Sequence, residues 1–346
     1  NPILMEIVAD TYYEYCVKQL PVPNSNKFVK IALHLYERIL NEFPDYYNIG
    51  WIYYQIGTIF MRQAESQLAL SHFHHALVSE SRIATLTAFC YEQLGRFAFY
   101  EERNFHKALS FLRRAMMVYP HNYPKLWLAN LYLLSSRVIF SLRQYDAALG
   151  EIQQAIEIAG QLVSKHKQAH AILLDALFVA GQLTWQLRNR QQDTITYLKR
   201  FIQLKSEPSD IDVTWSRVHE MLGDAYYALG QFRSAIVAYR VAIQFNPFSP
   251  TAASMCYRVA LSFYFVGDYV NVIAVINEMI AIHGKDVEII PSYRVYDTLG
   301  AAYFALEEYA LAATAYRQAL DFEPENTNDI EKMTRYYRYS LTLMNI

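Results

Sequence analysis

The sequence predicts an all-α fold, an α-solenoid made of stacked pairs of antiparallel helices. First, large and small residues alternate at helical spacings over 218–247, and the same pattern returns over 299–324. Second, Gly230 and Pro247 stand where a turn between two helices and the end of the second helix are expected. Third, 53% of the 346 residues are hydrophobic, with only 11 Gly and 11 Pro, as in well-packed helical proteins. One helix pair leaves an apolar face uncovered, so the pairs must stack.

Two stretches carry the repeating pattern most clearly. Over 218–247 its residues are Leu222-Gly223, Tyr226, Gly230, Phe232, Ala235, Tyr239, Ala242 and Pro247. The second copy has Leu299-Gly300, Tyr303, Tyr309, Ala312, Tyr316, Ala319 and Pro324. This pattern resembles a tetratricopeptide repeat, in which small residues let two helices approach and larger ones fill the space beside them. The resemblance implies a right-handed superhelix of about eight helix-turn-helix repeats, with residues 1–346 as a single solenoid.

Residues 1–48 are expected to form a degenerate N-terminal repeat. Its first helix is predicted over about 3–20, closed by a loop at 21–26 that contains two Pro residues. This first helix matches the repeat pattern poorly. The second helix carries the repeat residues Ala32, Tyr36, Ile39 and Pro44. Because terminal repeats of such arrays are atypical, we expect this pair to act as a cap.

Residues 49–326 are expected to hold seven repeats, followed by a C-terminal capping helix within 327–346. One small residue in the first helix of each repeat marks the frame: Gly57, Gly95, Ser136, Gly181, Gly223, Ala260 and Gly300. These residues recur every 37–45 positions, against about 34 in the usual repeat, so helices or loops are longer here. The repeat near Gly181 departs furthest, because Asp193 and Thr194 stand where its second helix should carry Ala.

The resemblance implies that the first helix of every pair lines a concave groove. Positions three before, one after and four after each small residue share one helical face. The column four after is apolar throughout: Met61, Phe99, Phe140, Trp185, Tyr227, Tyr264 and Phe304. Two interpretations of this column stay open. Its side chains either offer anchors to a partner or pack partly between neighbouring repeats, as aromatics at this position commonly do in the family.

The other two columns are more polar. Three before stand Tyr54, Glu92, Leu133, Phe178, Glu220, Tyr257 and Asp297, and one after stand Thr58, Arg96, Arg137, Gln182, Asp224, Leu261 and Ala301. Arg96 and Arg137 fall in consecutive repeats and are suited to holding a carboxylate or phosphate, although Arg96 is equally well placed to pair with Glu92. The groove is thus expected to be basic in its first half and acidic in its second. Candidate partner-binding residues are Tyr54, Met61, Arg96, Phe99, Arg137, Phe140, Phe178, Trp185, Asp224, Tyr227, Tyr257, Tyr264 and Phe304.

Composition and motifs argue against several other functions. The net charge of −2 gives no electrostatic case for nucleic acid. No apolar run approaches the roughly 20 residues of a membrane span. Cys16, Cys90 and Cys256 lie far apart and read as free thiols, so we expect a cytoplasmic protein, with a trimmed signal peptide or flanking domain left open.

Chemistry-bearing clusters are few. His72, His74 and His75 lack a further ligand at a supporting spacing, which favours a polar helix surface over a metal site. His166 and His170 have the spacing of a zinc helix, but Lys167 stands where a metalloprotease has Glu. Glycine-rich phosphate loops and nucleophile motifs are missing. We therefore expect no cofactor, no metal and no catalysis.

The first functional hypothesis is a protein–protein interaction scaffold that binds a peptide or helix of a partner protein in the groove, during assembly of a larger complex. Family members that bind chaperone tails use Lys and Asn in these columns, so such a tail is not expected here. An alternative is the ligand-sensing regulatory module of a longer signalling protein, hinged at the irregular repeat near Gly181. Self-association through Tyr12, Tyr13, Tyr336 and Tyr337 near the ends is a third hypothesis.

Overall fold

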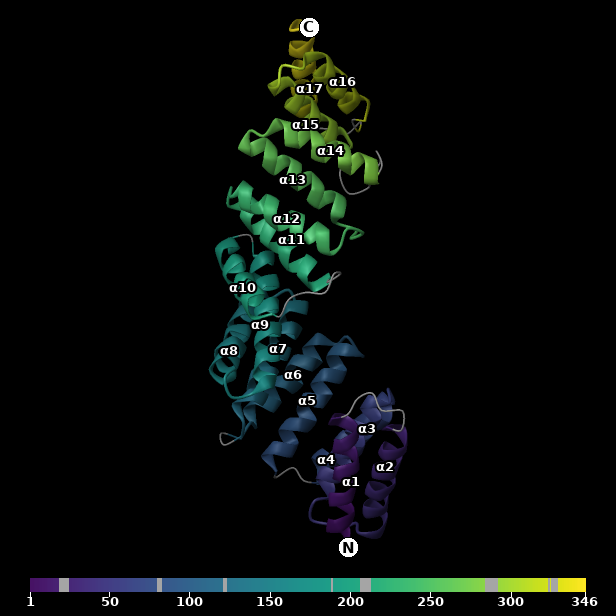
Figure 1. Ribbon diagram of the computed structural model, residues 1–346. Helices are drawn as coiled ribbons and strands as arrows, with labels where there is room; N and C mark the ends of the chain where they lie inside the picture. The colour runs from purple at the N-terminus through teal and green to yellow at the C-terminus, as the bar shows by residue number, and fades with distance from the viewer. Residues whose placement is uncertain are drawn as a thin grey trace. The chain divides into compact units, whose positions relative to one another are not determined.

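The computed structural model of the protein describes residues 1–18, 25–79, 83–120, 123–187, 189–205, 213–283, 292–322, 324 and 329–346. Within these residues the chain forms 17 α-helices and no strand (Figure 1). The chain divides into two compact units, unit 1 from Asn1 to Ala176 and unit 2 from Leu177 to Ile346. The prediction of an all-α solenoid of helical repeats is confirmed.

The helices follow one another with short connections. Unit 1 contains α1 (Pro2–Lys18), α2 (Ser25–Glu42), α3 (Ile49–Arg62), α4 (Ser66–Ser79), α5 (Ala84–Tyr100), α6 (Phe105–Met117), α7 (Lys125–Ser141) and α8 (Tyr145–Leu162). The boundary between the units falls inside α9 (Lys167–Gln186). Unit 2 continues with α10 (Gln191–Leu204), α11 (Val213–Ala228), α12 (Phe232–Phe245), α13 (Ala252–Val266), α14 (Tyr269–His283), α15 (Ser292–Ala305), α16 (Tyr309–Asp321) and α17 (Asp329–Met344).

In the repeat frame predicted from the sequence, each odd-numbered helix up to α15 is the first helix of a pair, and the even-numbered helix after it is the second. The two helices meet at the small residue that marks the frame. A Cβ atom on Gly57 would lie 2.7 Å from the Phe73 ring, and one on Gly181 would lie 2.2 Å from Leu198. The second helices contribute the buried residues Ala69, Phe73, Ala76, Ala108, Leu112, Ala115, Ala148, Ile152, Ala155, Ala235, Tyr239, Ala242, Ala312, Tyr316 and Ala319. Close approach at the small residues therefore sets the geometry of each pair.

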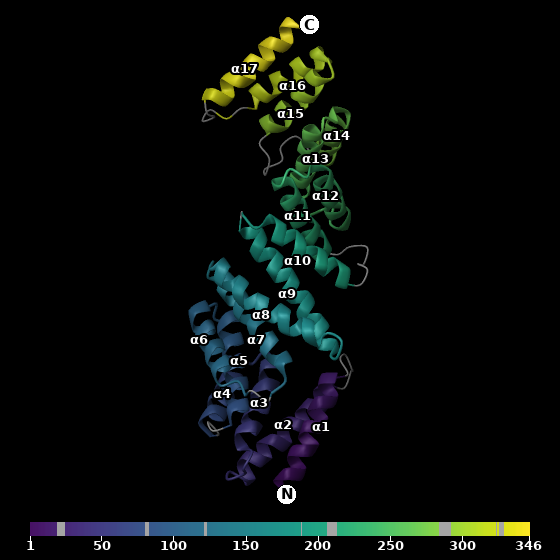
Figure 2. The same ribbon diagram turned by 90° about the vertical axis from the view of Figure 1, so that its left-hand side faces the viewer.

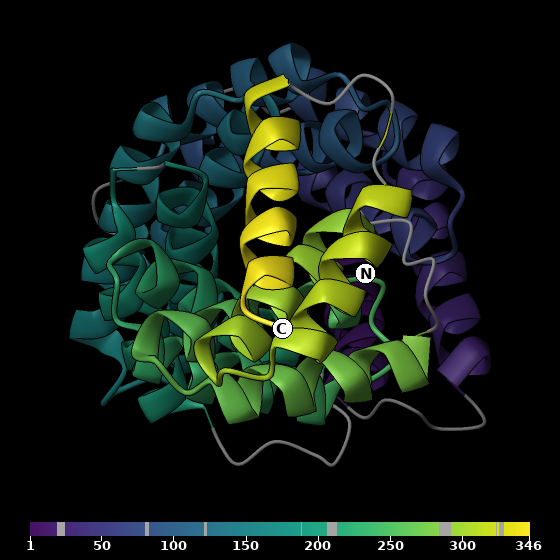
Figure 3. The same cartoon turned by 90° about the horizontal axis from the view of Figure 1, so that it is seen from above.

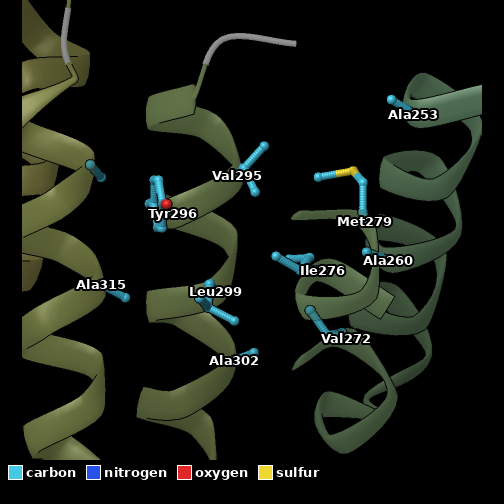
Figure 4. Close-up of a cluster of buried hydrophobic side chains, with 11 residues drawn as sticks. Ala253, Ala260, Val272, Ile276, Met279, Val295, Tyr296, Leu299, Ala302 and Ala315 are labelled. Carbon is cyan, nitrogen blue, oxygen red and sulfur yellow. The ribbon is translucent and has the colours of Figure 1, made fainter. Parts of the chain in front are cut away.

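Within each unit, apolar side chains are buried between neighbouring pairs. Between α13–α14 and α15–α16, the second helix α14 presents Val272, Ile276 and Met279 to Val295 and Leu299 of the next first helix (Figure 4). All five side chains are buried. Stacking thus covers the apolar face that a single pair would leave exposed.

Among the described residues, six turns between the two helices of a pair each contain one residue in the left-handed backbone region. Gly230 has φ +71° and Gly267 has φ +83°, which Gly adopts without steric cost. Four further residues with positive φ are not Gly: Ala64, Arg103, Arg143 and Glu307, with φ between 53° and 63°. The turn conformation is therefore set by the helix pair even where the residue does not favour it.

The irregular fifth pair keeps the repeat geometry with different residues. Thr194 of α10 is buried, and its hydroxyl donates a 3.0 Å hydrogen bond to the buried hydroxyl of Thr184 in α9. A Thr pair therefore replaces the expected small Ala, and each hydroxyl has a partner.

The terminal helices lie close to the predicted ranges. The first helix, predicted over about 3–20, is α1 at Pro2–Lys18, and residues 19 and 20 lie outside the described residues. The capping helix predicted within 327–346 is α17, which packs beside α16 (Figure 2). Figure 3 looks onto the C-terminal end of unit 2 and shows α17 in yellow as a straight helix. The division of the chain into eight repeats stays a prediction.

Candidate partner-binding face

The aromatic column on the first helices packs against the second helices. Phe99, Phe140, Tyr227, Tyr264 and Phe304 are all half-buried. Each contacts the aromatic residue that begins the second helix of its own pair, with ring centres 5.4–5.8 Å apart: Phe105, Tyr145, Phe232, Tyr269 and Tyr309 respectively. The packing interpretation therefore holds for part of each ring, while the rest of the ring remains accessible. The regular aromatic at the start of the second helix was the sequence signal for this contact.

In unit 1, three first helices line a pocket. Its volume is about 430 Å³ and its walls are Tyr13, Tyr54, Gln55, Thr58, Met61, Arg62, Glu92, Gln93 and Arg96. These residues come from α1, α3 and α5. The pocket gathers three of the predicted residues, Tyr54, Met61 and Arg96, together with α1 residue Tyr13, which the prediction assigned to self-association. Burial, with a smaller effect from the Glu92 carboxylate, raises the pKa of Tyr54, so its hydroxyl stays protonated at neutral pH.

The two candidate arginines of unit 1, Arg96 and Arg137, already have carboxylate partners. Arg96 Nε donates a 2.9 Å hydrogen bond to Glu92, which is only 5% exposed and also accepts the indole N–H of Trp127. Arg137 reaches Asp175 of α9 with 3.4 Å between Nη2 and Oδ2. The Arg96–Glu92 pairing weighed from the sequence is thus confirmed. The expected basic character is neutralised locally, because each guanidinium lies beside a carboxylate.

Asp224 in unit 2 is the centre of a hydrogen-bond network that joins three repeats. Its carboxylate accepts the indole N–H of Trp185 at 3.0 Å, the hydroxyl of Tyr239 at 2.6 Å and a guanidinium N–H of Arg258 at 2.9 Å. Arg258 also lies over the Tyr227 ring, 6.0 Å from its centre. Three of the predicted residues, Trp185, Asp224 and Tyr227, thus meet here, and Asp224 holds neighbouring repeats together.

Two further unit 2 candidates pack within the structure. The Trp185 ring lies under the guanidinium of Arg217, 4.6 Å away, and Arg217 in turn pairs with Glu220 at 2.7 Å. The Phe178 ring lies 5.9 Å from Phe201 of α10. The column pattern did not predict Arg217 and Arg258, because neither residue occupies one of the three columns.

At the C-terminal end of unit 2, two pockets adjoin. The first, about 340 Å³, is lined by Tyr257, Arg294, Asp297, Thr298, Ile330, Glu331, Thr334, Arg335 and Arg338. The second, about 220 Å³, is lined by Tyr264, Ala301, Phe304, Ala305, Tyr316, Arg338 and Leu341. Arg338 lines both. The predicted residues Tyr257, Tyr264 and Phe304 are therefore brought to one surface, which α17 completes with side chains that the column analysis did not reach.

The histidines of the 72–75 cluster pack against aromatic side chains. His72 stacks on Phe60 with ring centres 5.4 Å apart, and His75 stacks on Tyr53 at 5.3 Å. Among the described residues, no group of three His, Cys, Asp or Glu side chains is arranged to hold a metal ion. Cys90 is buried, which raises its thiol pKa to about 12. The Cys16 side chain lies outside the described residues. In the part of the chain that the structure describes, no helix has the length and apolar character needed to cross a membrane.

Sequence comparison identifies two repeats directly. A family model described as "Tetratricopeptide repeat" matches residues 216–249 and 293–326. These are the two stretches with the clearest pattern, and they correspond to α11–α12 and α15–α16. Among curated proteins, none matches this chain.

Solved structures share the fold at low sequence identity. The apo form of RapI aligns with a TM-score of 0.61 and 10% identity, over 99% of this chain and 97% of RapI. The C-terminal part of a TPR repeat-containing protein from Cytophaga hutchinsonii aligns at 0.54 and 14%, over 80% and 98% of the two chains. BtubC from P. vanneervenii aligns at 0.50 and 15%, over 69% and 91%. These similarities concern the fold alone.

Proposed function

We propose that this chain, which contains tetratricopeptide repeats, is a non-catalytic scaffold that binds a peptide or helix of a partner protein. Proteins with such repeats generally mediate interactions between proteins. The proposed binding surface is the face formed by the first helices of consecutive pairs, called here the first-helix face. Its role would be to hold the partner during assembly or positioning of a larger complex.

One observation carries this proposal. In each unit, side chains from three helices converge on a pocket: the first helices α1, α3 and α5 in unit 1, and the first helices α13 and α15 with the capping helix α17 in unit 2. Half-buried aromatic rings adjoin these pockets, and rings that are partly packed in advance lose little conformational freedom on binding. Tyr54 and Met61 lie at the unit 1 pocket, and Tyr264 and Phe304 line the smaller unit 2 pocket.

The absence of catalysis is part of the same proposal. Several charged residues on the first-helix face form ion pairs, such as Arg96–Glu92 and Arg258–Asp224. Groups held this way serve recognition and stability better than proton transfer, which needs a group with a reacting partner in reach. The alternative of a ligand-sensing module rested on an irregular fifth repeat, but the buried Thr184–Thr194 hydrogen bond gives that pair a well-packed core. A cytoplasmic location and self-association stay predictions.

Site-specific photo-crosslinking tests the proposal. Benzoyl-phenylalanine replaces Thr58 in the unit 1 pocket or Thr298 in the unit 2 pocket. The matched control replaces Thr314, which is exposed on the second helix α16. Irradiation in a lysate of the source organism should give discrete partner adducts at Thr58 or Thr298 that the Thr314 position does not give. Equal adducts at all three positions would count against the first-helix face.

A further inference from the structure

The two adjoining pockets of unit 2 form one strip along α15. Arg294, Asp297 and Thr298 line the larger pocket, which we call the arginine pocket. Ala301, Phe304 and Ala305 follow on the same helical face and line the smaller one, called here the aromatic pocket. The facing side of α17 has the same periodicity, from Ile330 and Thr334 through Arg338 to Leu341. A bound segment lying along α15 would therefore meet the arginine pocket at one end and the aromatic pocket at the other.

The arginine pocket has an excess of positive charge. Three guanidinium groups line it, with only the carboxylates of Asp297 and Glu331 as counter-charges. Arg338 pairs with Asp297 at 3.0 Å, and Arg335 pairs with Glu331 at 3.4 Å. No carboxylate in the described residues forms an ion pair with the third, Arg294, which is exposed and donates a 3.2 Å hydrogen bond to the Tyr293 hydroxyl. One positive charge is thus left to attract an anion.

The pocket is built from ordered groups. Arg335 is only 5% exposed, and its guanidinium lies 4.4 Å from the centre of the Tyr293 ring. The Tyr257 hydroxyl donates to the backbone carbonyl of Arg294 at 3.2 Å, so the first turn of α15 is fixed. Arg294 and Glu331 both lie in the first turns of their helices, where the positive ends of the helix dipoles also favour an anion.

A buried acceptor completes the arrangement. Asp297 Oδ1 is buried and finds no hydrogen-bond donor among the described residues, while its Oδ2 takes the bond from Arg338. Because Oδ1 is out of reach of solvent, a peptide whose anion meets Arg294 would offer it a backbone N–H only by turning the Asp297 carboxylate toward the pocket. An isolated anion would satisfy only the arginine, so the pocket suits a peptide better than a free ion.

The aromatic pocket suits an apolar side chain. Tyr264, Phe304 and Leu341 are half-buried at its walls, and Tyr316 forms its buried floor. Desolvating a Leu or Phe side chain there is favourable in proportion to the apolar area that leaves water. Arg338, which lines both pockets, lies between the two sites.

We infer that this strip binds a partner segment in which an anionic side chain occupies the arginine pocket and an apolar side chain occupies the aromatic pocket. The inference rests on the proposed function and names the chemistry of the peptide that unit 2 recognises. The anionic group is the carboxylate of Asp or Glu, whose single charge matches the one pocket guanidinium that has no ion-pair partner among the described residues.

Selection from a random dodecamer peptide library tests the inference. The full chain is the bait, and in parallel so are Arg294→Glu and Phe304→Ala. Arg317→Glu is the matched control, because Arg317 is exposed on α16 and lines neither pocket. Circular dichroism verifies that each variant is folded. Selected peptides should be enriched in Asp or Glu together with an apolar residue. Their affinity should fall about tenfold or more with Arg294→Glu, since a charge-assisted hydrogen bond becomes a repulsion, and less than about twofold with Arg317→Glu.

Three other outcomes would overturn the inference in distinguishable ways. The inference would be overturned by selected peptides without acidic residues, or by peptides that bind Arg294→Glu and the natural chain equally. The proposed function would still stand if Phe304→Ala weakened the binding of those peptides. Peptides insensitive to both changes would overturn both, as would no enrichment. For a confirmed peptide, replacing its acidic residue by Gln should abolish the effect of Arg294→Glu, because the interaction that this variant disrupts is then already lost.

Discussion

Gly223 of α11 lies directly against the ring of Tyr239 in α12, so that a Cβ atom on Gly223 would be 2.5 Å from Tyr239 Cδ1. Carbon atoms pack best at about 3.5–4.0 Å, so no side chain fits at this position without displacing the ring. Tyr239 cannot move freely, because it is fully buried and its hydroxyl is bonded to Asp224. The pair therefore fixes how closely α11 and α12 approach.

We expect Gly223→Ala to lower the free energy of unfolding. The added methyl group overpacks the contact with Tyr239, which lowers the free energy of unfolding by about 1–3 kcal/mol. The better helix propensity of Ala offsets about 1 kcal/mol of this loss. Urea unfolding followed by circular dichroism measures the difference. Gly150→Ala in α8 is the control, because no atom lies within 4 Å of a Cβ there, and it should raise stability by about 0.5–1 kcal/mol. Equal effects at both sites would contradict the proposed role of close approach.

Ala64→Gly is expected to stabilise the protein. Ala64 has φ +62° in the turn between α3 and α4, a conformation that costs an L-residue about 1–2 kcal/mol and Gly almost nothing. The greater entropy of Gly in the unfolded chain offsets part of this gain, which leaves about 0.5–1 kcal/mol. Gly267→Ala, at φ +83°, should show the opposite sign. Thermal unfolding of the two variants checks both, and a destabilised Ala64→Gly would refute the strain argument.

The fold could be predicted because its determinants are local. A small residue at Gly181 or Gly223 is visible in the sequence, and the size of its partner in the second helix follows at a regular spacing. The turn at Ala64 was not predictable in the same way. The short turn imposes left-handed geometry on whichever residue occupies it, so the sequence need not have Gly at that position and carries no signal for the turn.

The electrostatic state of the candidate site was less predictable. Pairing of Arg96 with Glu92 could be weighed, because both stand on one helix four residues apart. The bonds from Trp127 to Glu92 and from Arg258 to Asp224 join successive repeats, so they depend on how the pairs stack. The columns of the sequence contain the charged residues without those partners, and for this reason they predict a basic half and an acidic half.

Asp224→Ala should destabilise unit 2 strongly. The substitution leaves the indole N–H of Trp185, the Tyr239 hydroxyl and the Arg258 guanidinium without their shared acceptor. Loss of hydrogen bonds to a partly buried charge costs about 2–4 kcal/mol, whereas Asp224→Asn keeps an acceptor and should cost less. Urea unfolding followed by tryptophan fluorescence ranks the two variants. If Asp224→Ala were as stable as the natural chain, the network would not hold the repeats together, and Asp224 would be available to bind a partner.

Acid should weaken the fold through His219. This half-buried side chain lies with its ring 5.7 Å from Trp215, and burial lowers its pKa to about 4. The unfolded pKa is about 6.5, so between about pH 4 and 6.5 the unfolded chain binds more protons than the folded one. The free energy of unfolding therefore falls as pH falls through this window, by about 3 kcal/mol in total, and His219 contributes no slope above it. Urea unfolding across the window should give a shallower pH dependence for His219→Gln than for the natural chain. His166→Gln, at an exposed position, is the control and should leave the pH dependence of the free energy of unfolding unchanged. If His219→Gln also left it unchanged, burial of the His219 ring would not contribute to the pH dependence of stability.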